Sequence, residues 1–265
     1  MDKLLTHNKN RWEALAQARI QYSRPFLDIT PENALQNLDR DPVFLNSPFT
    51  EVVGKDVLCL ASGGGQQSAV FSLLGANVTV FDLSETQLAR DQEAADHFGY
   101  AVKLEQGDMQ DLSCFANNSF DIVWQPYSIN FVPDAAVVIR GVSRIIRPNG
   151  FYHLQFSNPY WSMEPEDWTP QGYPIKQPYQ TGQKLKFADT AWTFTDDAGN
   201  EQKVEGPHEF MHTFSTMFNT LIQSGFIILG MEEWPEGDAT AEPGSWEHFL
   251  TILPPFVTIA ALFQN

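Results

Sequence analysis

The sequence is poor in cysteine and in basic residues, and it lacks a long apolar segment. Two cysteines in 265 residues are too few for the disulfide framework of a secreted scaffold, so we expect a cytoplasmic protein. Lysine and arginine total 16 against 33 acidic residues, and the net charge of −17 disfavours nucleic acids and anionic membranes as partners. The longest apolar stretch, residues 253–263, contains two prolines and is too short to span a bilayer, and the first residues contain no apolar core of signal-peptide length.

Strand-like and helix-like segments alternate from residue 56 onward. The run 56–61 is continuously apolar and ends at three glycines, which is typical of a strand buried on both faces of a parallel sheet. The alternation predicts an α/β fold with a doubly wound, mainly parallel sheet. The expected strands are 56–61, 77–82, 101–106, 120–124, 151–156, 226–232 and 256–263, and the expected helices are 66–74, 84–99, 133–147 and 213–224.

Two segments lie outside this alternation. Residues 1–50 have apolar residues at helical spacing and are expected to form an N-terminal helical cap on the main domain, residues 51–265. Residues 158–207 carry repeated prolines between large aromatic residues, and residues 192–204 are typical of a hairpin with its turn at 196–199. A long, aromatic-rich insertion in a compact domain is usually functional, so we interpret it as a lid over a substrate.

Glycine and acidic residues follow the first three expected strands, at the sheet edge where α/β folds bind ligands. The turn Gly63–Gly65 lets a ligand approach the backbone closely. Asp82 is placed to accept both hydroxyls of a ribose, while Asp108 can accept an adenine amine and Met109 can pack on the ring. Each feature alone has a structural explanation, as a connecting turn or a cap. Together they predict one nucleoside-shaped ligand across adjacent strands.

Five segments carry a family resemblance: VLCLASGGG at 57–65, VFDLS at 80–84, QGDM at 106–109, FDIV at 120–123 and VSRIIRPNG at 142–150. They resemble the successive motifs of class I (Rossmann-like) S-adenosylmethionine-dependent methyltransferases of the small-molecule type. The resemblance implies a seven-stranded sheet whose last strand, 256–263, is antiparallel. It also implies S-adenosylmethionine as cofactor and S-adenosylhomocysteine as product, with cofactor contacts from Tyr22, Ala61, Gly63, Gly65, Asp82, Leu83, Gln87, Asp108, Met109 and Gln125.

Two positions depart from the family pattern. The family usually has an acid where Cys59 stands and a glycine where Ala61 stands. Weaker or rearranged cofactor binding is therefore expected, and a non-catalytic S-adenosylmethionine-binding protein stays open as an alternative. A nicotinamide-dependent oxidoreductase is a second alternative, because Gly63-x-Gly65-x-x-Ser68 nearly fits its fingerprint. That alternative leaves Asp108 unexplained.

The acceptor is expected to be a small molecule, bound by a monomer or homodimer. We predict that Tyr127, Asn130, Phe131, Tyr160 and Trp161 form the substrate wall. His208 and His212 match the zinc-protease spacing H-E-x-x-H, but their segment is expected to be extended and to precede the helix that starts near Thr213, so no metal is predicted. One of the two histidines is instead the candidate base. His153, in the middle of a strand, is interpreted as a core residue.

Overall fold

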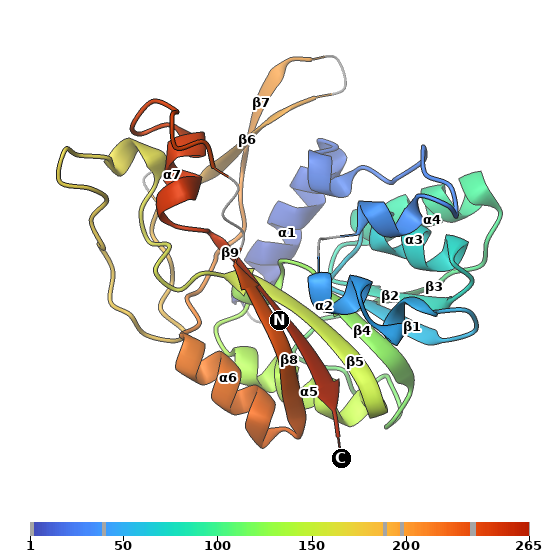
Figure 1. The fold of residues 1–265 in the computed structure, drawn as a ribbon. Coiled ribbons are helices and arrows are strands. Elements are labelled where there is room, and N and C mark those ends of the chain that lie inside the picture. Colours follow the sequence, from blue (N-terminus) through green and yellow to red (C-terminus); the bar gives the residue numbers. More distant parts are fainter. Residues whose placement is uncertain (1–2, 39–40, 188–189, 197–198, 234–236, 265) are drawn as a thin grey trace.

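The computed structural model describes residues 3–38, 41–187, 190–196, 199–233 and 237–264. Its described residues form a seven-stranded sheet in the order β3-β2-β1-β4-β5-β9-β8, in which β9 is antiparallel to both neighbours and the first five strands are parallel, as predicted (Figure 1). The strands are β1 Asp56–Leu60, β2 Asn77–Asp82, β3 Lys103–Gln106, β4 Phe120–Gln125, β5 Ile146–Ser157, β8 Phe226–Glu233 and β9 Phe256–Phe263.

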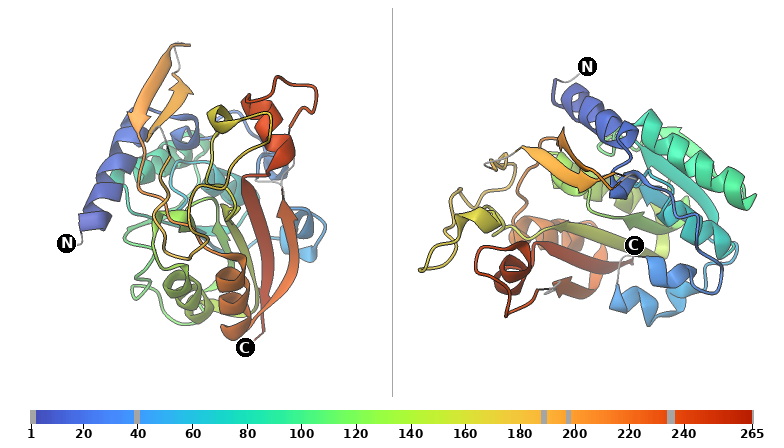
Figure 2. Two further views of the ribbon diagram at one scale, coloured as in Figure 1. Left: turned by 90° about the vertical axis from the view of Figure 1, so that its left-hand side faces the viewer. Right: turned by 90° about the horizontal axis from the view of Figure 1, so that it is seen from above.

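Helices cover both faces of the sheet and bury two apolar clusters against it (Figures 1 and 2). On one face α5 (Ala135–Ile145) and α6 (Phe214–Gln223) pack, and α5 buries Val138, Ile139 and Val142 at helical spacing. On the other face lie α2 (Pro42–Leu45), α3 (Gln67–Leu73) and α4 (Glu85–Phe98). A strand buried on both faces needs an unbroken apolar run, which explains why β1 was recognisable in the sequence.

The N-terminal segment begins with one long helix, which is followed by short helical turns. Helix α1 (Lys3–Gln17) packs on α4, where the Glu13 carboxylate accepts the backbone N–H of Glu85 at 2.7 Å. Three short 3₁₀ turns, Gln21–Ser23, Ala34–Asn37 and Pro48–Thr50, and the single turn of α2 make up much of the rest of the expected cap. A carboxylate at a helix N-terminus satisfies free amides and favours the helix dipole, so α1 is fixed at the start of α4.

The insertion contains the expected hairpin, formed by β6 (Ala191–Thr195) and β7 (Glu201–Glu205). Residues 197–198 of its predicted turn lie outside the described residues. The ring of Trp192 contacts Trp12 of α1 and Phe131, with centroids 5.6 and 6.4 Å apart, and the Arg24 guanidinium donates to the carbonyl of Thr195 at 2.6 Å. The hairpin therefore rests on the N-terminal segment and projects past α1 (Figure 1).

One helix was not predicted. Helix α7 (Trp246–Ile252) lies between β8 and β9, and its N-cap Ser245 accepts the backbone N–H of His248 at 3.2 Å. A single two-turn helix gives only a weak periodic signal, which accounts for the omission. In the described part of the chain, no helix combines the length and the apolar character needed to cross a membrane.

Candidate active site

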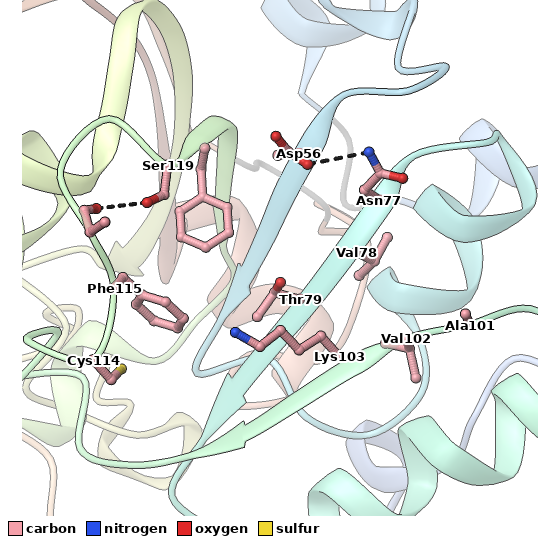
Figure 3. A pocket seen from close by; sticks show the side chains of 12 residues that line it. Asp56, Asn77, Val78, Thr79, Ala101, Val102, Lys103, Cys114, Phe115 and Ser119 are labelled. Carbon is pink, nitrogen blue, oxygen red and sulfur yellow. Dashed lines mark hydrogen bonds between the residues drawn. The ribbon is translucent and has the colours of Figure 1, made fainter.

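A cavity of about 1020 Å³ opens at the carboxyl ends of β1, β2, β3 and β4. Its wall combines α1, the glycine turn, these strand ends, the insertion and α7. A second hollow of about 580 Å³ lies at the opposite, amino ends of β1 to β4, among Asp56, Asn77, Lys103 and Phe120 (Figure 3). Ligands of open parallel sheets bind beyond the carboxyl ends of the strands, so the larger cavity is the candidate site.

The glycine turn forms a notch in the cavity wall. A Cβ added to Gly63 would lie 2.7 Å from the Cβ of Gln87 and 3.0 Å from the Cγ of Asp82, so only glycine fits there. Gly64 and Gly65 adopt positive φ angles of 134° and 75°, which other residues rarely adopt. Ala61, in the place of the usual glycine, has φ of 48°, so its methyl group is accepted at the cost of a left-handed backbone.

Asp82 lies beside this notch and lines the cavity. Its two carboxylate oxygens accept the backbone N–H groups of Gly63 and Ser84, both at 2.9 Å. Each oxygen keeps a second lone-pair direction for a ligand hydroxyl. Burial raises the pKa of Asp82 to about 6, while hydrogen bonds from the backbone of Ser84, Gly63 and Leu83 oppose that shift.

The remaining polar residues of the predicted nucleoside site also line the cavity. Asp108 follows β3, and its carboxylate accepts the side-chain and backbone N–H groups of Gln110 at 3.0 Å. The side chain of Gln87 lies beside the notch, and no donor in the described chain reaches its buried Oε1 atom. The predicted contacts that line the cavity are Tyr22, Ala61, Gly63, Asp82, Leu83, Gln87, Asp108 and Met109.

Two predicted cofactor contacts are not among the described residues that line the cavity. Gly65 packs behind the turn, where an added Cβ would lie 2.6 Å from Pro25. The side chain of Gln125 is buried in the core, where its Oε1 accepts the hydroxyl hydrogen of Tyr152 at 2.6 Å. Both residues therefore support the site from behind.

Asp91 is a buried carboxylate that sequence reasoning missed. It lies on α4 and accepts the backbone N–H groups of Gly64 at 3.0 Å and Gly65 at 3.1 Å, together with the hydroxyl hydrogen of Ser68 at 2.5 Å. Burial raises the pKa of Asp91 to about 7, and its charge contributes to raising the pKa of Cys59. An acid that contacts the glycine turn is thus present, on α4 and not at position 59.

Three of the five residues predicted to form the substrate wall lie at the cavity. Tyr127, Phe131 and Trp161 line the cavity. Asn130 is fully buried elsewhere, because its amide donates to the Ser157 hydroxyl at 2.6 Å and to the Phe210 carbonyl at 2.8 Å. Tyr160 is 45% exposed and stacks on Tyr179. Asn130 therefore ties two segments together, and Tyr160 belongs to the outer surface.

Neither candidate histidine is among the described residues that line the cavity. His212 is fully buried, its Nε2 lies 3.1 Å from the carbonyl oxygen of Ile129, and burial lowers its pKa to about 4. The ring of His208 stacks on His7, with centroids 3.8 Å apart. The structure therefore does not support a histidine base.

The segment that contains the two histidines is extended, as expected. Residues 208–212 are not helical, and α6 starts after its predicted cap Thr213, whose side chain accepts the amide of Thr216.

His153 has the structural role that was expected. It is fully buried, its Nδ1 lies 2.9 Å from a carboxylate oxygen of Asp41, and its ring stacks on Trp124 at 3.7 Å.

The described residues contain no group of three or more His, Cys, Asp or Glu side chains placed to hold a metal ion.

Between the two histidines, Glu209 lines the cavity. Its Oε2 accepts the hydroxyl hydrogen of Tyr127 at 2.5 Å, and burial raises the pKa of Glu209 to about 7. The pattern H-E-x-x-H drew attention to the histidines, and nothing in the local sequence distinguishes the glutamate. Its pairing with Tyr127 depends on a contact across 82 residues.

The residues around the notch fit an adenosyl cofactor. The space beside Gly63 is one that a Cβ would fill, Asp82 offers a fixed carboxylate, and Gln87 presents a buried acceptor without a donor in the described chain. A ligand with several hydroxyl and amine donors satisfies these groups at once.

Comparisons with known proteins indicate a methyltransferase. Residues 58–154 match the family model described as "Methyltransferase domain". The chain is 29% identical over 238 residues to an uncharacterized methyltransferase, YbaJ, of Bacillus subtilis strain 168, and the match covers 88% of this chain and 91% of that protein. A ubiquinone biosynthesis O-methyltransferase of Pseudomonas syringae pv. tomato is 35% identical over 99 residues, which cover 37% of this chain and 43% of that enzyme.

A solved structure extends the likeness to most of the chain. A crystal structure of an S-adenosylmethionine-dependent methyltransferase from Mesorhizobium loti superposes with a TM-score of 0.60 at 25% identity, covering 89% of this chain and 99% of that one. The glycine notch, the strand-end acids and these likenesses lead to one conclusion: residues 58–154 form a methyltransferase domain, and the chain is similar over most of its length to S-adenosylmethionine-dependent methyltransferases, which supports S-adenosylmethionine as its cofactor.

Proposed function

We propose that this methyltransferase acts on a small-molecule acceptor bound under the insertion. The observation that carries the proposal is the continuity of the cavity, in which the cofactor notch at Gly63 and the aromatic wall at Trp161 and Trp192 line the same space of about 1020 Å³. Small-molecule sites commonly enclose about 300–1,000 Å³, and this space suits a nucleoside cofactor with a compact acceptor. The ubiquinone O-methyltransferases among the relatives, by their name, support a small acceptor.

The charge and the cover of the site also favour a small acceptor. A net charge of −17 disfavours a nucleic-acid substrate. The hairpin rests on α1, and both contribute side chains to the cavity wall, Trp192 from the hairpin and Trp12 from α1. We assign residues 158–207 the role of a lid on this basis. A covered site excludes water and restricts access by large substrates.

When bound, S-adenosylmethionine supplies a methyl group on a sulfonium, which makes the methyl carbon electrophilic. The task of the protein is then alignment, exclusion of water and proton removal where the acceptor needs it. We assign Asp82 to the ribose hydroxyls, Asp108 to the adenine amine and Met109 to the adenine ring, because these residues line the cavity at adjacent strand ends. Tyr127 and Phe131, from the loop after β4, form the wall on the acceptor side.

Replacement of Asp82 by Asn is expected to weaken binding of S-adenosylhomocysteine. The change removes the charge that strengthens hydrogen bonds to two hydroxyls, which costs about 1–3 kcal/mol and corresponds to a roughly 5- to 150-fold rise in Kd. Isothermal titration calorimetry measures this change. Asp111→Asn, at an exposed residue outside the cavity lining, is the control. An unchanged Kd in Asp82→Asn would remove the ribose assignment.

Binding is also expected to weaken as the pH falls below 6. Burial raises the pKa of Asp82 to about 6, and only its ionised form accepts two hydroxyl hydrogens at full strength. Below pH 6 the ionised fraction falls about tenfold per pH unit, and Kd for S-adenosylhomocysteine should rise in the same proportion. Asp91 and Glu13 carry charges that act on Asp82, so the same titration is repeated on Asp82→Asn. The variant should show little change in Kd between pH 6 and pH 5, and an equal dependence in both proteins would assign it to another group.

The proposed function is tested by turnover. Purified protein is incubated with radiolabelled S-adenosylmethionine and a panel of phenols, thiols, amines and carboxylates, and labelled products are separated from the cofactor. Methyl transfer to a small acceptor, reduced in Asp82→Asn at limiting cofactor, is the expected result. Tight cofactor binding with no transfer to any acceptor class would favour the non-catalytic alternative.

A further inference from the structure

Glu209 is a buried carboxyl group at the acceptor end of the cavity, and hydrogen bonds fix its position. Its Oε2 accepts the Tyr127 hydroxyl hydrogen at 2.5 Å, and it has no other hydrogen-bond partner for its side chain among the described residues. The residue is 9% exposed and lines the cavity, so its second oxygen is available to a ligand there. A buried carboxyl group with one fixed partner and one free oxygen is suited to receive a proton.

The backbone holds Glu209 in this position from both sides. The preceding residue, His208, donates its N–H to the Asn8 side chain at 2.8 Å, and the following residue, Phe210, donates to the carbonyl of Asn130 at 2.7 Å. The carbonyl of Glu209 accepts the N–H of Leu185 at 2.9 Å. Tyr127 is fixed too, because its N–H donates to the Gln155 side chain at 3.2 Å. Hydrogen bonds from four parts of the chain therefore preorganise the pair.

The charge of the cavity restricts the acceptor. Its described lining contains five carboxyl groups and no Lys, Arg or His. Two of the five, Asp82 and Asp108, belong to the cofactor end, and three remain: Glu164, Glu166 and Glu209. An acceptor that carries a carboxylate or phosphate would meet like charge without a compensating cation in a partly desolvated space. The described lining therefore disfavours an acceptor that carries a carboxylate or a phosphate.

Aromatic side chains dominate the same end. Trp161 lies at its centre, with ring centroids 5.8 Å from Phe187, 6.3 Å from Trp246 and 5.5 Å from Phe256, and all four residues line the cavity. The buried Nε1–H of Trp161 has no acceptor among the described residues. Flat aromatic walls favour a planar ligand, and an unpaired donor favours a ligand oxygen near it.

We propose that Glu209, positioned by Tyr127, is the general base of this enzyme, and that its acceptor is an uncharged aromatic compound methylated on a hydroxyl group. The inference rests on the proposed small-molecule methyltransferase function and adds the acceptor class and the base. An amine with a free lone pair needs no base, whereas a phenol must lose its proton as it becomes an ether. A fixed carboxylate next to a flat space with aromatic walls can take the proton that a phenol must lose.

The step balances without a further reactant. A bond forms between the phenolic oxygen and the methyl carbon as the bond between that carbon and the sulfonium sulfur breaks. The O–H proton passes to the Glu209 carboxylate, and S-adenosylhomocysteine leaves as a neutral thioether. Glu209 then returns the proton to water when the ether departs. Burial raises the pKa of Glu209 to about 7, which places the base near neutral pH, and Tyr127 is the titratable residue that acts on it in the described structure.

The test uses phenols of graded acidity on the full-length protein. Glu209→Gln keeps the shape but accepts no proton, and we expect kcat to fall about 100- to 1,000-fold with catechol. With 4-nitrocatechol, whose hydroxyl is far more acidic and gives up its proton with less help from a base, the loss should be less than about tenfold. This difference between acceptors distinguishes loss of a base from disturbed packing. Tyr127→Phe should keep the base but shift the acid limb of the kcat profile, because it removes the hydrogen bond that lowers the pKa of Glu209.

Two controls separate the possible failures. Glu201→Gln changes an exposed glutamate of β7 that is outside the cavity lining, and its kcat should match that of the unaltered protein. The Kd of S-adenosylhomocysteine should be unchanged in Glu209→Gln. Equal losses with both catechols, or wild-type kcat in Glu209→Gln, overturn the base. Transfer to amines or to carboxylates with none to phenols overturns the acceptor class but leaves the methyltransferase function intact, whereas failure to bind S-adenosylhomocysteine at all contradicts the function itself.

Discussion

Replacement of Asp91 by Ala is expected to lower the affinity for S-adenosylhomocysteine by at least 100-fold and to destabilise the fold by about 3 kcal/mol. The Asp91 carboxylate accepts hydrogens from the Gly64 and Gly65 amides and from the Ser68 hydroxyl, and it is fully buried. Alanine leaves three buried donors without an acceptor, and each such donor costs about 1–3 kcal/mol. Removal of a buried charge offsets part of that cost, since burial raises the pKa of Asp91 to about 7.

The effect on binding follows from the geometry of the turn. The amides of Gly64 and Gly65 point away from the cavity toward Asp91, while Gly63 lines the cavity and donates to Asp82. Loss of the carboxylate frees the two rear amides, and the notch at Gly63 loses its support. We therefore expect the notch to lose the shape that admits the cofactor.

Urea denaturation and calorimetric titration measure the two effects of the Asp91 variants. Asp96→Ala changes an exposed acid of the same helix and should alter neither quantity by more than about 0.5 kcal/mol. Asp91→Asn keeps one acceptor oxygen, so its stability and its cofactor affinity should lie between those of Asp91→Ala and Asp96→Ala. Wild-type affinity in Asp91→Ala would show that the turn keeps its shape without this carboxylate.

The fold and the front of the cofactor site were predictable because their signals are local. The apolar runs at β1 and β2 mark strands buried on both faces, and the acid at the end of β2, Asp82, follows directly along the chain. Ser84 caps α4 as its spacing predicts, accepting the amide of Gln87 at 3.1 Å. Chain order alone placed Gly63, Asp82 and Asp108 at one sheet edge, because parallel strands bring their carboxyl ends together.

The back of the site and the acceptor end were not predictable, because they depend on distant pairs. Asp91 reaches the glycine turn across 27 residues, and Glu209 meets Tyr127 across 82. Local spacing pointed to His212 as a base. In the structure His212 is fully buried beside the carbonyl group of Ile129 and does not line the cavity. The departure at Cys59, on strand β1, was recognised, but nothing in the sequence around Asp91, on helix α4, marks it as the acid that contacts the glycine turn.

Replacement of Gly65 by Ala is expected to be the most damaging single methyl addition in the turn. Its φ of 75° strains any other residue by about 1–2 kcal/mol, and its Cβ would lie 2.6 Å from both the Arg90 carbonyl oxygen and the Pro25 Cβ. Real Cβ contacts do not approach so closely, so the backbone of α4 or the segment after α1 must move. Overpacking of this kind costs about 1–3 kcal/mol more.

Gly99, the C-cap of α4, offers a matched control for this prediction. It has the same φ of 75°, but nothing lies within 4 Å of an added Cβ. Gly99→Ala therefore reports the backbone strain alone, about 1–2 kcal/mol, and should leave cofactor affinity unchanged. Gly65→Ala adds the collision, and because Gly65 also donates to Asp91 and accepts the N–H of Phe26, the movement reaches the notch. We expect denaturation to show a loss of about 2–5 kcal/mol in Gly65→Ala, and calorimetry to show no measurable S-adenosylhomocysteine binding. Equal losses of stability in the two variants, with binding retained, would mean that the turn moves freely and that its packing against α4 does not shape the site.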